Sequence, residues 1–557
     1  MRRIAAVVIG ALILSGGAFF FFLRDEGTVA PVEGAPGLDE MADRVGAPIM
    51  RLVSNGEYEG RGGEVIFVPR PNYYLGPDVD LTRWGTDDPE MFTSHPNPWA
   101  YLTRVPVFVY APGRAPVGAE SYDEVELVDL APTIAQMLGM DGFAVDGEPL
   151  PGIDYDRGPP KLIFTVVMDG GGWNVLRQHP AAWNELRSLA RQGMTYKNAI
   201  IGSTPAMTGA IHANIGTGVY PKTHGIPTNP YFVRGDPRNL LVPTIGDLWD
   251  ESHGNRPLVG AITVLSTQLG MLGHGAQRDG GDHDIGVFWD ETNHRWIANT
   301  DYYELPDTLG ETDLDTLAAY EEELDGHDSF DDGHWFDDTI DSLRVGLRRA
   351  STPAFARYEG DEVVELLRTQ PWGDDELTDL FYVQMKSLDQ AGHNWNMVNP
   401  EVGDVLAETS RQIARFKAEL DREVGVGEYV MMITADHGQQ PLAHIAGGWM
   451  INAKELERDI EERFGVDVRI GTHYVNLLEE GADQTQIARF LGTYTVGDNI
   501  AVGIPGEDRV APALRRERIF VGAFPGAYLR ALSAEEIESF GESEFPQGDL
   551  IVDPPSS

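Results

Sequence analysis

Residues 161–172 read KLIFTVVMDGGG, an apolar run that stops at Asp169 and is followed by three glycines. The same pattern returns in LTDLFYVQMKSLDQAGH, residues 377–393, and in EYVMMITADHG, residues 428–438. Stretches with helical periodicity lie between these runs, such as EVGDVLAETSRQIARFKAEL at 401–420. Apolar strands that alternate with amphipathic helices predict an α/β fold, in which a mostly parallel central sheet is covered by helices on both faces.

The polar residues that end these runs predict a metal site. Ligands of such sheets gather at the carboxyl ends of the strands, which is where the pattern puts Asp169, Asp389 and Asp436. His393 lies four residues after Asp389, and His437 follows Asp436 directly. One aspartate at a strand end is typical of a turn or a helix cap. Carboxylates combined with neutral imidazoles, however, are ligands of zinc and similar divalent ions.

A candidate nucleophile lies in STPAMTGAIHANIGTGVYPKTHGIPTN, residues 203–229, which supplies hydroxyl groups at the start of a predicted helix. The N-terminus of a helix presents free N–H groups and the positive end of its dipole, which suits a phosphate group. Threonine is a poor nucleophile in water because it holds its proton. A bound divalent ion lowers this barrier by favouring the alkoxide.

These motifs resemble the alkaline phosphatase superfamily, and most closely its nucleotide pyrophosphatase/phosphodiesterase branch. That branch has a Thr, a His four residues later, and then TG, HGI and an Asn, which fall here at Thr208, His212, Thr217–Gly218, His224–Gly225–Ile226 and Asn229. The resemblance implies an alkaline phosphatase-like fold with two zinc ions. It makes Thr208 the nucleophile and a ligand of one zinc, which is completed by Asp169, Asp436 and His437.

The resemblance also assigns Asp389 and His393 to the second zinc, and it implies that Asn229 donates a hydrogen bond to a phosphate oxygen. We interpret His212 and His224 as structural residues of the motif. The proline that the family has two residues after its nucleophile is Ala210 here. Thr204, which is followed directly by Pro205, is therefore an alternative nucleophile.

The second zinc still needs a histidine, which the family supplies far downstream of DHG. Residues 93–140 instead resemble the end of a family member, because a histidine-bearing loop precedes the strand-like VPVFVYAPG and the helix-like VDLAPTIAQMLGM. This order predicts a circular permutation, in which the last core segment precedes the first and His95 is the missing ligand. The alternatives are His473, in GTHYVNL, or no third histidine.

The composition and the N-terminus restrict the cellular setting. The 557 residues contain no cysteine, which excludes disulfides and thiolate metal sites, and the formal charge of −46 disfavours nucleic-acid binding. Residues 4–23 carry no charge and follow two arginines. A helix over this run spans about 30 Å, enough for a bilayer. It predicts an N-terminal transmembrane anchor with the remaining chain outside the cytoplasm; a cleaved signal peptide is the alternative.

The predicted organisation has five parts. They are a membrane anchor at 1–24, a tether at 25–60, the permuted C-terminal segment of the core at 61–157, the main catalytic core at 158–450, and a covering segment that shapes the substrate pocket at 451–557.

The predicted function is metal-dependent hydrolysis of a small phosphate ester through a phosphothreonine intermediate. Asn229 matches the diesterase branch that the sequence resembles, which favours a diester or a nucleotide pyrophosphate over a monoester. A monoester would need additional cationic donors for its third charged oxygen. Arg278 and Lys222 are candidates for such donors. The alternative from another class is a non-catalytic metal-binding protein of the cell envelope with a phosphatase-like fold.

Overall fold

The computed structural model describes most of the chain, namely residues 32, 34–76, 81–82, 84–85, 93–140, 142–143, 145–275, 284–324, 349–479 and 481–545. Among these residues, no helix has the length and apolar character needed to cross a bilayer. The predicted membrane anchor, residues 1–24, lies outside the described residues, as does Arg278.

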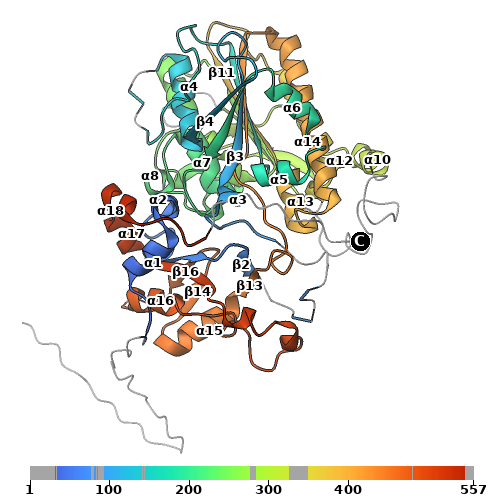
Figure 1. The fold of residues 1–557 in the computed structure, drawn as a ribbon. Helices are drawn as coiled ribbons and strands as arrows, with labels where there is room; N and C mark the ends of the chain where they lie inside the picture. The colour runs from blue at the N-terminus through green and yellow to red at the C-terminus, as the bar shows by residue number, and fades with distance from the viewer. Residues whose placement is uncertain are drawn as a thin grey trace, which may run out of the picture.

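A large mixed sheet forms the centre of the molecule (Figure 1). Its strands follow the order β10 (Tyr303–Glu304), β8 (Asp284–Asp290), β7 (Val259–Thr263), β11 (Asp379–Met385), β5 (Leu162–Met168), β12 (Tyr429–Thr434), β3 (Arg104–Tyr110), β6 (Met194–Ile200) and β4 (Ala119–Glu126). All neighbours from β10 to β12 run parallel, whereas β3 runs antiparallel to both β12 and β6. β9 (Arg295–Ala298) pairs antiparallel with β8. The predicted α/β class is confirmed, and the sheet is mostly parallel.

The strand β5, whose sequence opens the pattern above, lies in the middle of the sheet. Each of its seven residues is buried, as expected for a parallel strand that is covered on both faces. β11 and β12 pair with it on either side in parallel register. The carboxyl ends of these three strands therefore meet at one edge of the sheet.

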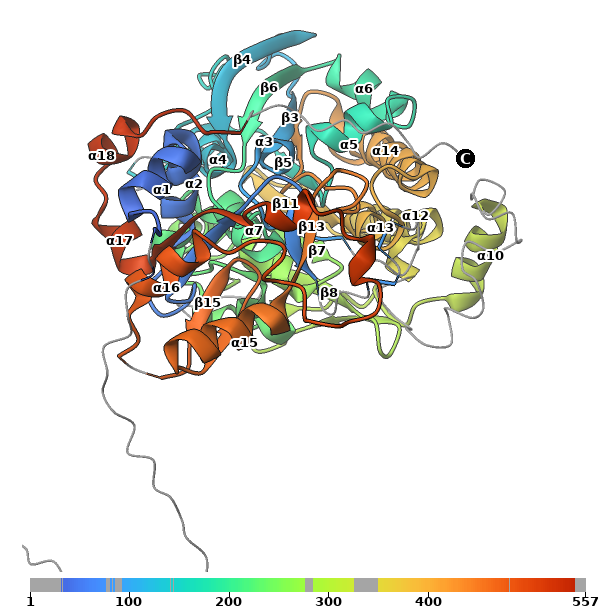
Figure 2. The ribbon, with the colours of Figure 1, turned by 60° about the horizontal axis from the view of Figure 1, so that its bottom comes forward.

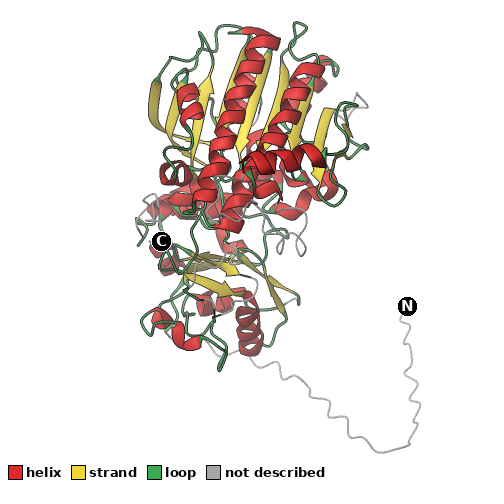
Figure 3. Ribbon diagram, turned by 90° about the vertical axis from the view of Figure 1, so that its right-hand side faces the viewer, coloured by secondary structure: helices red, strands yellow, loops and turns green. Residues whose placement is uncertain are grey.

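Helices cover both faces of this sheet (Figure 3). One face packs against α5 (Trp173–Gln178), α6 (Asn184–Ala190), α12 (Pro353–Thr369), α13 (Ser387–Trp395) and α14 (Pro400–Leu420), with α10 (Leu314–Leu324) against α12. The other face packs against α4 (Leu130–Leu138), α7 (Thr208–Thr217) and α9 (Ile245–His253). Two short helices, α3 (Ala100–Thr103) and α8 (Pro221–His224), lie in connections.

A smaller layer lies beyond the carboxyl edge of the main sheet (Figure 1). Its antiparallel sheet has the order β14 (Val468–Ile470), β15 (Tyr474–Leu477), β1 (Val65–Pro69) and β16 (Phe520–Pro525), and β13 (Trp449–Asn452) pairs with β2 (Tyr73–Gly76) nearby. Its helices are α1 (Leu38–Val45), α2 (Ala47–Gly56), α15 (Ala453–Phe464), α16 (Gln484–Leu491), α17 (Gly526–Ala531) and α18 (Ala534–Ser539).

Two predicted segments divide differently in the structure. Residues 38–56 of the predicted tether form α1 and α2, because Met41, Val45 and Ile49 bury their side chains in an apolar cluster with β16. The segment 61–157 is split: β1 and β2 join the smaller layer, whereas β3 and β4 join the main sheet. The circular permutation itself stays a prediction.

The packing around β5 gives a stability prediction. Phe164 is fully buried and its ring lies 5.4 Å from that of Phe381 and 6.0 Å from that of Phe416. We expect Phe164→Ala to lower the free energy of unfolding by about 3–5 kcal/mol, because it leaves a cavity between the sheet and α14. Guanidinium unfolding followed by circular dichroism measures the change.

The matched control is Val502→Ala, at a side chain that is 99% exposed. It should change the free energy of unfolding by less than about 0.5 kcal/mol. Equal unfolding midpoints for the two variants would contradict the central position of β5.

Candidate metal centre

Three strand ends converge at the carboxyl edge of β11, β5 and β12. Asp169 follows β5 directly, Asp389 lies in the first turn of α13 after β11, and Asp436 follows β12. Each of the three carboxyl side chains is at most 1% exposed. The parallel register of the strands thus places the predicted aspartates together, as the sequence pattern indicated.

The glycines after Asp169 allow this convergence. Gly170 has φ of +73°, and a Cβ atom there would lie 2.5 Å from Nε2 of Gln439 and 3.0 Å from Cα of Asp389. The N–H of Gly170 donates to Oδ1 of Asp436 at 3.0 Å. A residue with a side chain at position 170 would push the three loops apart.

The predicted second half-site has its three members in contact. The four-residue spacing puts Asp389 and His393 on one face of α13, with Oδ1 of Asp389 3.4 Å from Nε2 of His393. Nε2 of His95 lies 3.3 Å from the same oxygen and 3.2 Å from Nε2 of His393. His473 instead lies beside β15 in the smaller layer, where its carbonyl oxygen accepts from the N–H of Phe67.

The predicted first half-site surrounds His437. Nε2 of His437 lies 3.4 Å from Oδ1 of Asp169 and 3.4 Å from Oδ2 of Asp436. The same nitrogen is 3.9 Å from Oδ1 of Asp389, and the His437 ring stacks on that of His95 with centroids 3.6 Å apart. The two half-sites are therefore contiguous.

Each of the three histidines directs Nδ1 at a backbone carbonyl oxygen: His95 at that of Ala206 (2.7 Å), His393 at that of Thr93 (2.5 Å) and His437 at that of Gly438 (2.9 Å). A carbonyl oxygen only accepts, so Nδ1 carries the proton and donates. The three Nε2 atoms then face the carboxylates. This arrangement is typical of histidines that bind a metal through Nε2.

Thr208 is the first residue of α7 and is buried. The N–H of the next residue, Gly209, donates to Oδ1 of Asn229 at 2.9 Å, so Asn229 lies beside the N-terminus of α7 and keeps its Nδ2 group as a donor. The alternative nucleophile Thr204 packs differently, because its N–H donates to the carbonyl oxygen of Leu52 in α2.

His212, which the sequence analysis treated as structural, also reaches the site. Its Nδ1 lies 2.8 Å from the carbonyl oxygen of Thr208 and 3.6 Å from Oδ2 of Asp436. It forms a group with Asp169 and Asp436 whose ligand atoms lie close enough together to hold one ion. The other motif histidine, His224, keeps the expected structural role, since its Nε2 contacts Oδ1 of Asn214 at 2.9 Å.

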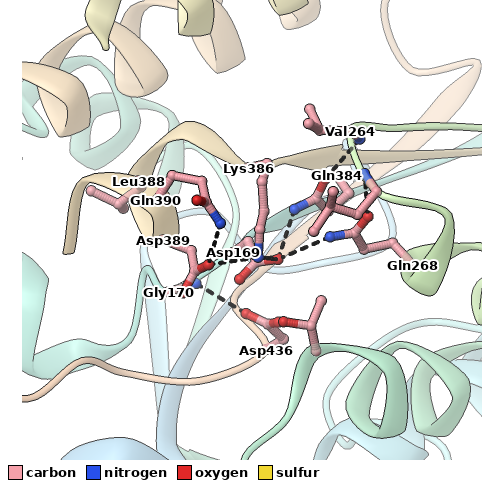
Figure 4. Close-up of polar contacts among 12 residues, drawn as sticks. Asp169, Gly170, Val264, Gln268, Gln384, Lys386, Leu388, Asp389, Gln390 and Asp436 are labelled. Carbon is pink, nitrogen blue, oxygen red and sulfur yellow. Dashed lines mark hydrogen bonds and ion pairs between the residues drawn. The ribbon is translucent and has the colours of Figure 1, made fainter. Parts of the chain in front are cut away.

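Lys386 is the functional candidate that the sequence analysis missed. It follows β11 and is 2% exposed. Its Nζ donates to Oδ2 of Asp169 at 3.0 Å and to Oδ2 of Asp389 at 2.6 Å (Figure 4). Gln384 also donates to Oδ2 of Asp169, at 2.7 Å. The alternation of Gln384 and Lys386 at the end of an apolar strand was the available signal, because residues two apart share a face.

Burial and Lys386 act in opposite directions on the carboxyl groups. Burial raises the pKa of Asp169, but the charge of Lys386 and the contact with His437 together outweigh it, so this pKa lies below its ordinary value. Burial likewise raises the pKa of Asp389, and His393 and Lys386 together bring it well below its ordinary value. Burial and the charge of Asp169 hold the pKa of Asp436 well above its ordinary value.

His95, His393 and His212 favour the neutral form. Burial lowers the pKa of His95, and it lowers the pKa of His393 and that of His212 to about 4 each. A neutral imidazole is the form that binds a metal ion.

The donor atoms fit a divalent metal ion. In the described part of the chain, four buried atoms of the site lack a hydrogen-bond partner: Oδ1 of Asp169, Oδ1 of Asp389, Oδ2 of Asp436 and Nε2 of His437. Buried polar atoms without a partner are costly and require an explanation. Carboxylate oxygens and imidazole nitrogens together form the donor set of zinc and similar ions.

A comparison with known protein families finds one whose sequence model matches this chain. Residues 163–478 match the sequence model of the family described as type I phosphodiesterase / nucleotide pyrophosphatase. This range contains all the candidate site residues except His95, which lies in the segment that the predicted permutation would have moved.

Curated relatives match at low identity. Alkaline phosphatase PafA of Elizabethkingia meningoseptica is 23% identical over 366 residues, which cover 55% of this chain and 66% of the relative. Alkaline phosphatase PhoV of Synechococcus elongatus is 23% identical over 340 residues, which cover 52% of this chain and 60% of the relative. The chain thus matches less than two thirds of the length of either relative.

Solved structures are similar over about half of the chain. The crystal structure of PafA matches with a TM-score of 0.45 and 21% identity, and it covers 55% of this chain and 69% of PafA. Murine ectonucleotide pyrophosphatase / phosphodiesterase 5 matches with a TM-score of 0.28 and 14% identity, and it covers 50% and 56%. The assignment rests on the family match, which spans more than half of the residues: the chain belongs to the type I phosphodiesterase / nucleotide pyrophosphatase family.

Proposed function

We propose that this protein hydrolyses phosphate esters, with a preference for diesters, at a centre that holds two divalent ions. The observation that carries the proposal is the convergence of Asp169, Asp389 and Asp436 with three inward-facing histidine Nε2 atoms. Asp169, Asp436, His437 and Thr208 would hold one ion, and Asp389, His393 and His95 the other. The mixed oxygen and nitrogen donor set favours zinc.

Bound ions would supply positive charge that stabilises the phosphate oxygens and favours the alkoxide of Thr208. In the proposed reaction, Oγ1 of Thr208 loses its proton and attacks phosphorus, and the bond from phosphorus to the leaving alcohol breaks as that alcohol takes up a proton. Water then cleaves the phosphothreonine, which releases the phosphate product and restores the hydroxyl group. The N-terminus of α7 and the amide of Asn229 would orient the phosphate oxygens during both displacements.

The surroundings of the site favour a diester. A monoester carries an additional charged oxygen that needs a cationic donor. One predicted donor, Lys222, is engaged elsewhere, because its Nζ donates to Oδ1 of Asn55 at 2.7 Å and lies over the ring of Tyr220. Hydrolysis of a monoester is the second candidate, because the curated relatives are named alkaline phosphatases.

We also propose that the catalytic part of the chain lies outside the cytoplasm. This part of the proposal rests on the uncharged run at residues 4–23 and the two arginines before it.

The role of Thr208 is tested by Thr208→Ala. We expect hydrolysis of bis-p-nitrophenyl phosphate to fall by about 10³-fold or more, because the nucleophile is lost. Thr208→Ser should keep measurable turnover, since it retains a hydroxyl group. Thr204→Ala is the matched control and should retain activity; loss of turnover in Thr204→Ala with normal turnover in Thr208→Ala would move the nucleophile to Thr204.

The substrate class and the metal requirement are tested together on the wild-type protein. We expect bis-p-nitrophenyl phosphate to be hydrolysed faster than p-nitrophenyl phosphate, and a chelator to abolish both reactions until zinc is restored. A nucleotide substrate completes the panel. Hydrolysis of none of the three in the presence of zinc would favour the non-catalytic alternative.

Lys386 provides a test that does not depend on activity. Its ammonium group pairs with two buried carboxylates, so Lys386→Met should lower the free energy of unfolding of the chelated protein by about 3–5 kcal/mol. Added zinc should stabilise Lys386→Met more than wild type, because the ions then supply the missing positive charge. Thermal unfolding with and without zinc measures this difference; an equal response of both proteins would contradict the position of Lys386 between the ligands.

A further inference from the structure

A second candidate site lies apart from the metal centre. A half-open cavity of about 400 Å³ is lined by residues of α5, α6 and the strands β3, β4 and β6. Figure 2 shows where these elements lie. Its lining consists of Phe108, Gly118, Ala119, Glu120, Trp173, Arg177, Trp183, Arg187, Ala190, Arg191, Thr195 and Lys197. These residues include no candidate metal ligand, so the cavity is not part of the centre described above.

The charge of this cavity is opposite to that of the chain. The sequence has 88 acidic residues against 42 lysines and arginines. The described lining has the reverse balance, with four cationic side chains and one carboxylate, Glu120, whose Oε1 pairs with Nζ of Lys197 at 3.0 Å. The cavity therefore keeps an excess of positive charge on a protein whose overall field repels anions.

Aromatic rings contact three of these four cations, Arg177, Arg187 and Lys197. The guanidinium carbon of Arg187 lies 4.2 Å from the centroid of the Trp183 ring. Nζ of Lys197 lies 5.0 Å, and the guanidinium carbon of Arg177 5.6 Å, from that of Trp173. Cation–π contacts of this kind hold long side chains in place at a modest gain in energy. The charged groups are thus held around the cavity before a ligand arrives, which lowers the entropic cost of binding.

One of the lining cations, Arg177, also lies near a cation outside the lining, Arg104. Burial lowers the pKa of Arg177, and the nearby charge of Arg104 lowers it further. Like charges that are held near one another repel, and a bound anion would relieve that repulsion.

One buried donor in the lining lacks a partner. Nε1 of Trp173, a residue that is 3% exposed, has no hydrogen-bond acceptor within the described residues. Trp183, on the same cavity, donates its Nε1–H to the carbonyl oxygen of Leu176 at 2.8 Å. Buried indole N–H groups usually find an acceptor. The N–H group of Trp173 is shielded from solvent, so a ligand in the cavity would contact the ring and not this donor.

We propose that this cavity binds a small organic anion that carries a flat apolar group. Its carboxylate, sulfonate or phosphate end would pair with Arg187, Arg191 and Lys197, and its flat part would pack against Trp173 and Phe108. The volume lies within the range of small-molecule sites, which combine aromatic walls with a few charged groups. The inference rests on a different part of the molecule from the metal centre and does not depend on the proposed reaction.

The test uses naphthalene-2-sulfonate, an anion that the proposed reaction cannot hydrolyse. Isothermal titration calorimetry is done on the whole protein in a buffer free of phosphate, once with zinc and once with a chelator, so that binding at the metal centre is recognised by its dependence on the metal ions. We expect one saturable site per chain, and binding of the uncharged 2-naphthalenemethanol to be weaker by about tenfold or more, the equivalent of about 1.4 kcal/mol for the lost charge contacts.

Variants locate the site. Arg187→Gln combined with Arg191→Gln should weaken sulfonate binding by about tenfold or more, because two charge-assisted contacts are lost. Arg458→Gln is the matched control: Arg458 lies on α15 in the smaller layer, is half exposed and pairs with Glu455, so its loss should leave binding unchanged. Ala190→Phe keeps every charge but fills the cavity, and it should abolish binding while circular dichroism stays that of the wild type.

Three results would overturn the proposal. Absence of saturable binding of the sulfonate would show that the cavity takes no such ligand. Equal affinity for the sulfonate and the alcohol would show that the cations do not contribute. Unchanged binding in both the double arginine variant and Ala190→Phe would place the ligand elsewhere on the protein.

Discussion

Buried negative charge is the constraint on which the rest of this structure depends. The ends of β11, β5 and β12 bring three carboxyl groups into a region shielded from water. Such groups are tolerated only when they are paired with cations or hydrogen-bonded. Lys386 meets this requirement for the outer oxygens of Asp169 and Asp389. The other oxygens, Oδ1 of Asp169 and Oδ1 of Asp389, have no hydrogen-bond partner among the described residues and face the histidines.

Each ligand side chain of the site has one atom that is hydrogen-bonded to the protein and another that faces the other ligands. The atoms that point away from the centre of the site are hydrogen-bonded to the protein. Lys386 and Gln384 donate to Oδ2 of Asp169, and Nδ1 of each histidine donates to a backbone carbonyl oxygen. Inner atoms are thereby oriented toward a common space. Such an arrangement has fixed geometry before any ion binds, which is the condition under which bound ions act on a substrate without reorganisation of the protein.

Because the protein as a whole is strongly acidic, local groups of cations decide where an anion can bind. On a chain with a formal charge of −46, an anionic ligand is attracted only where positive charge is concentrated. The metal centre would gain that charge from its ions, whereas the cavity beside α5 and α6 has it built in through Arg177, Arg187, Arg191 and Lys197. The metal centre at the carboxyl edge of the main sheet and the cavity on one face of it would thus attract anions in different ways, the first through bound ions and the second through its own cationic side chains.

The sequence by itself determined the alternation of strands and helices, the aspartates at three strand ends and the pairing of Asp389 with His393, because these features depend on local periodicity. It also pointed to His95 through the resemblance of its surroundings. Only the tertiary structure decided that His95 lies beside His393, 298 positions further along the chain, that Lys386 bridges two carboxylates, and that α1 and α2 fold where a tether was expected. Local spacing sets which face of an element a side chain occupies, but strand order and the packing of distant segments set which side chains meet.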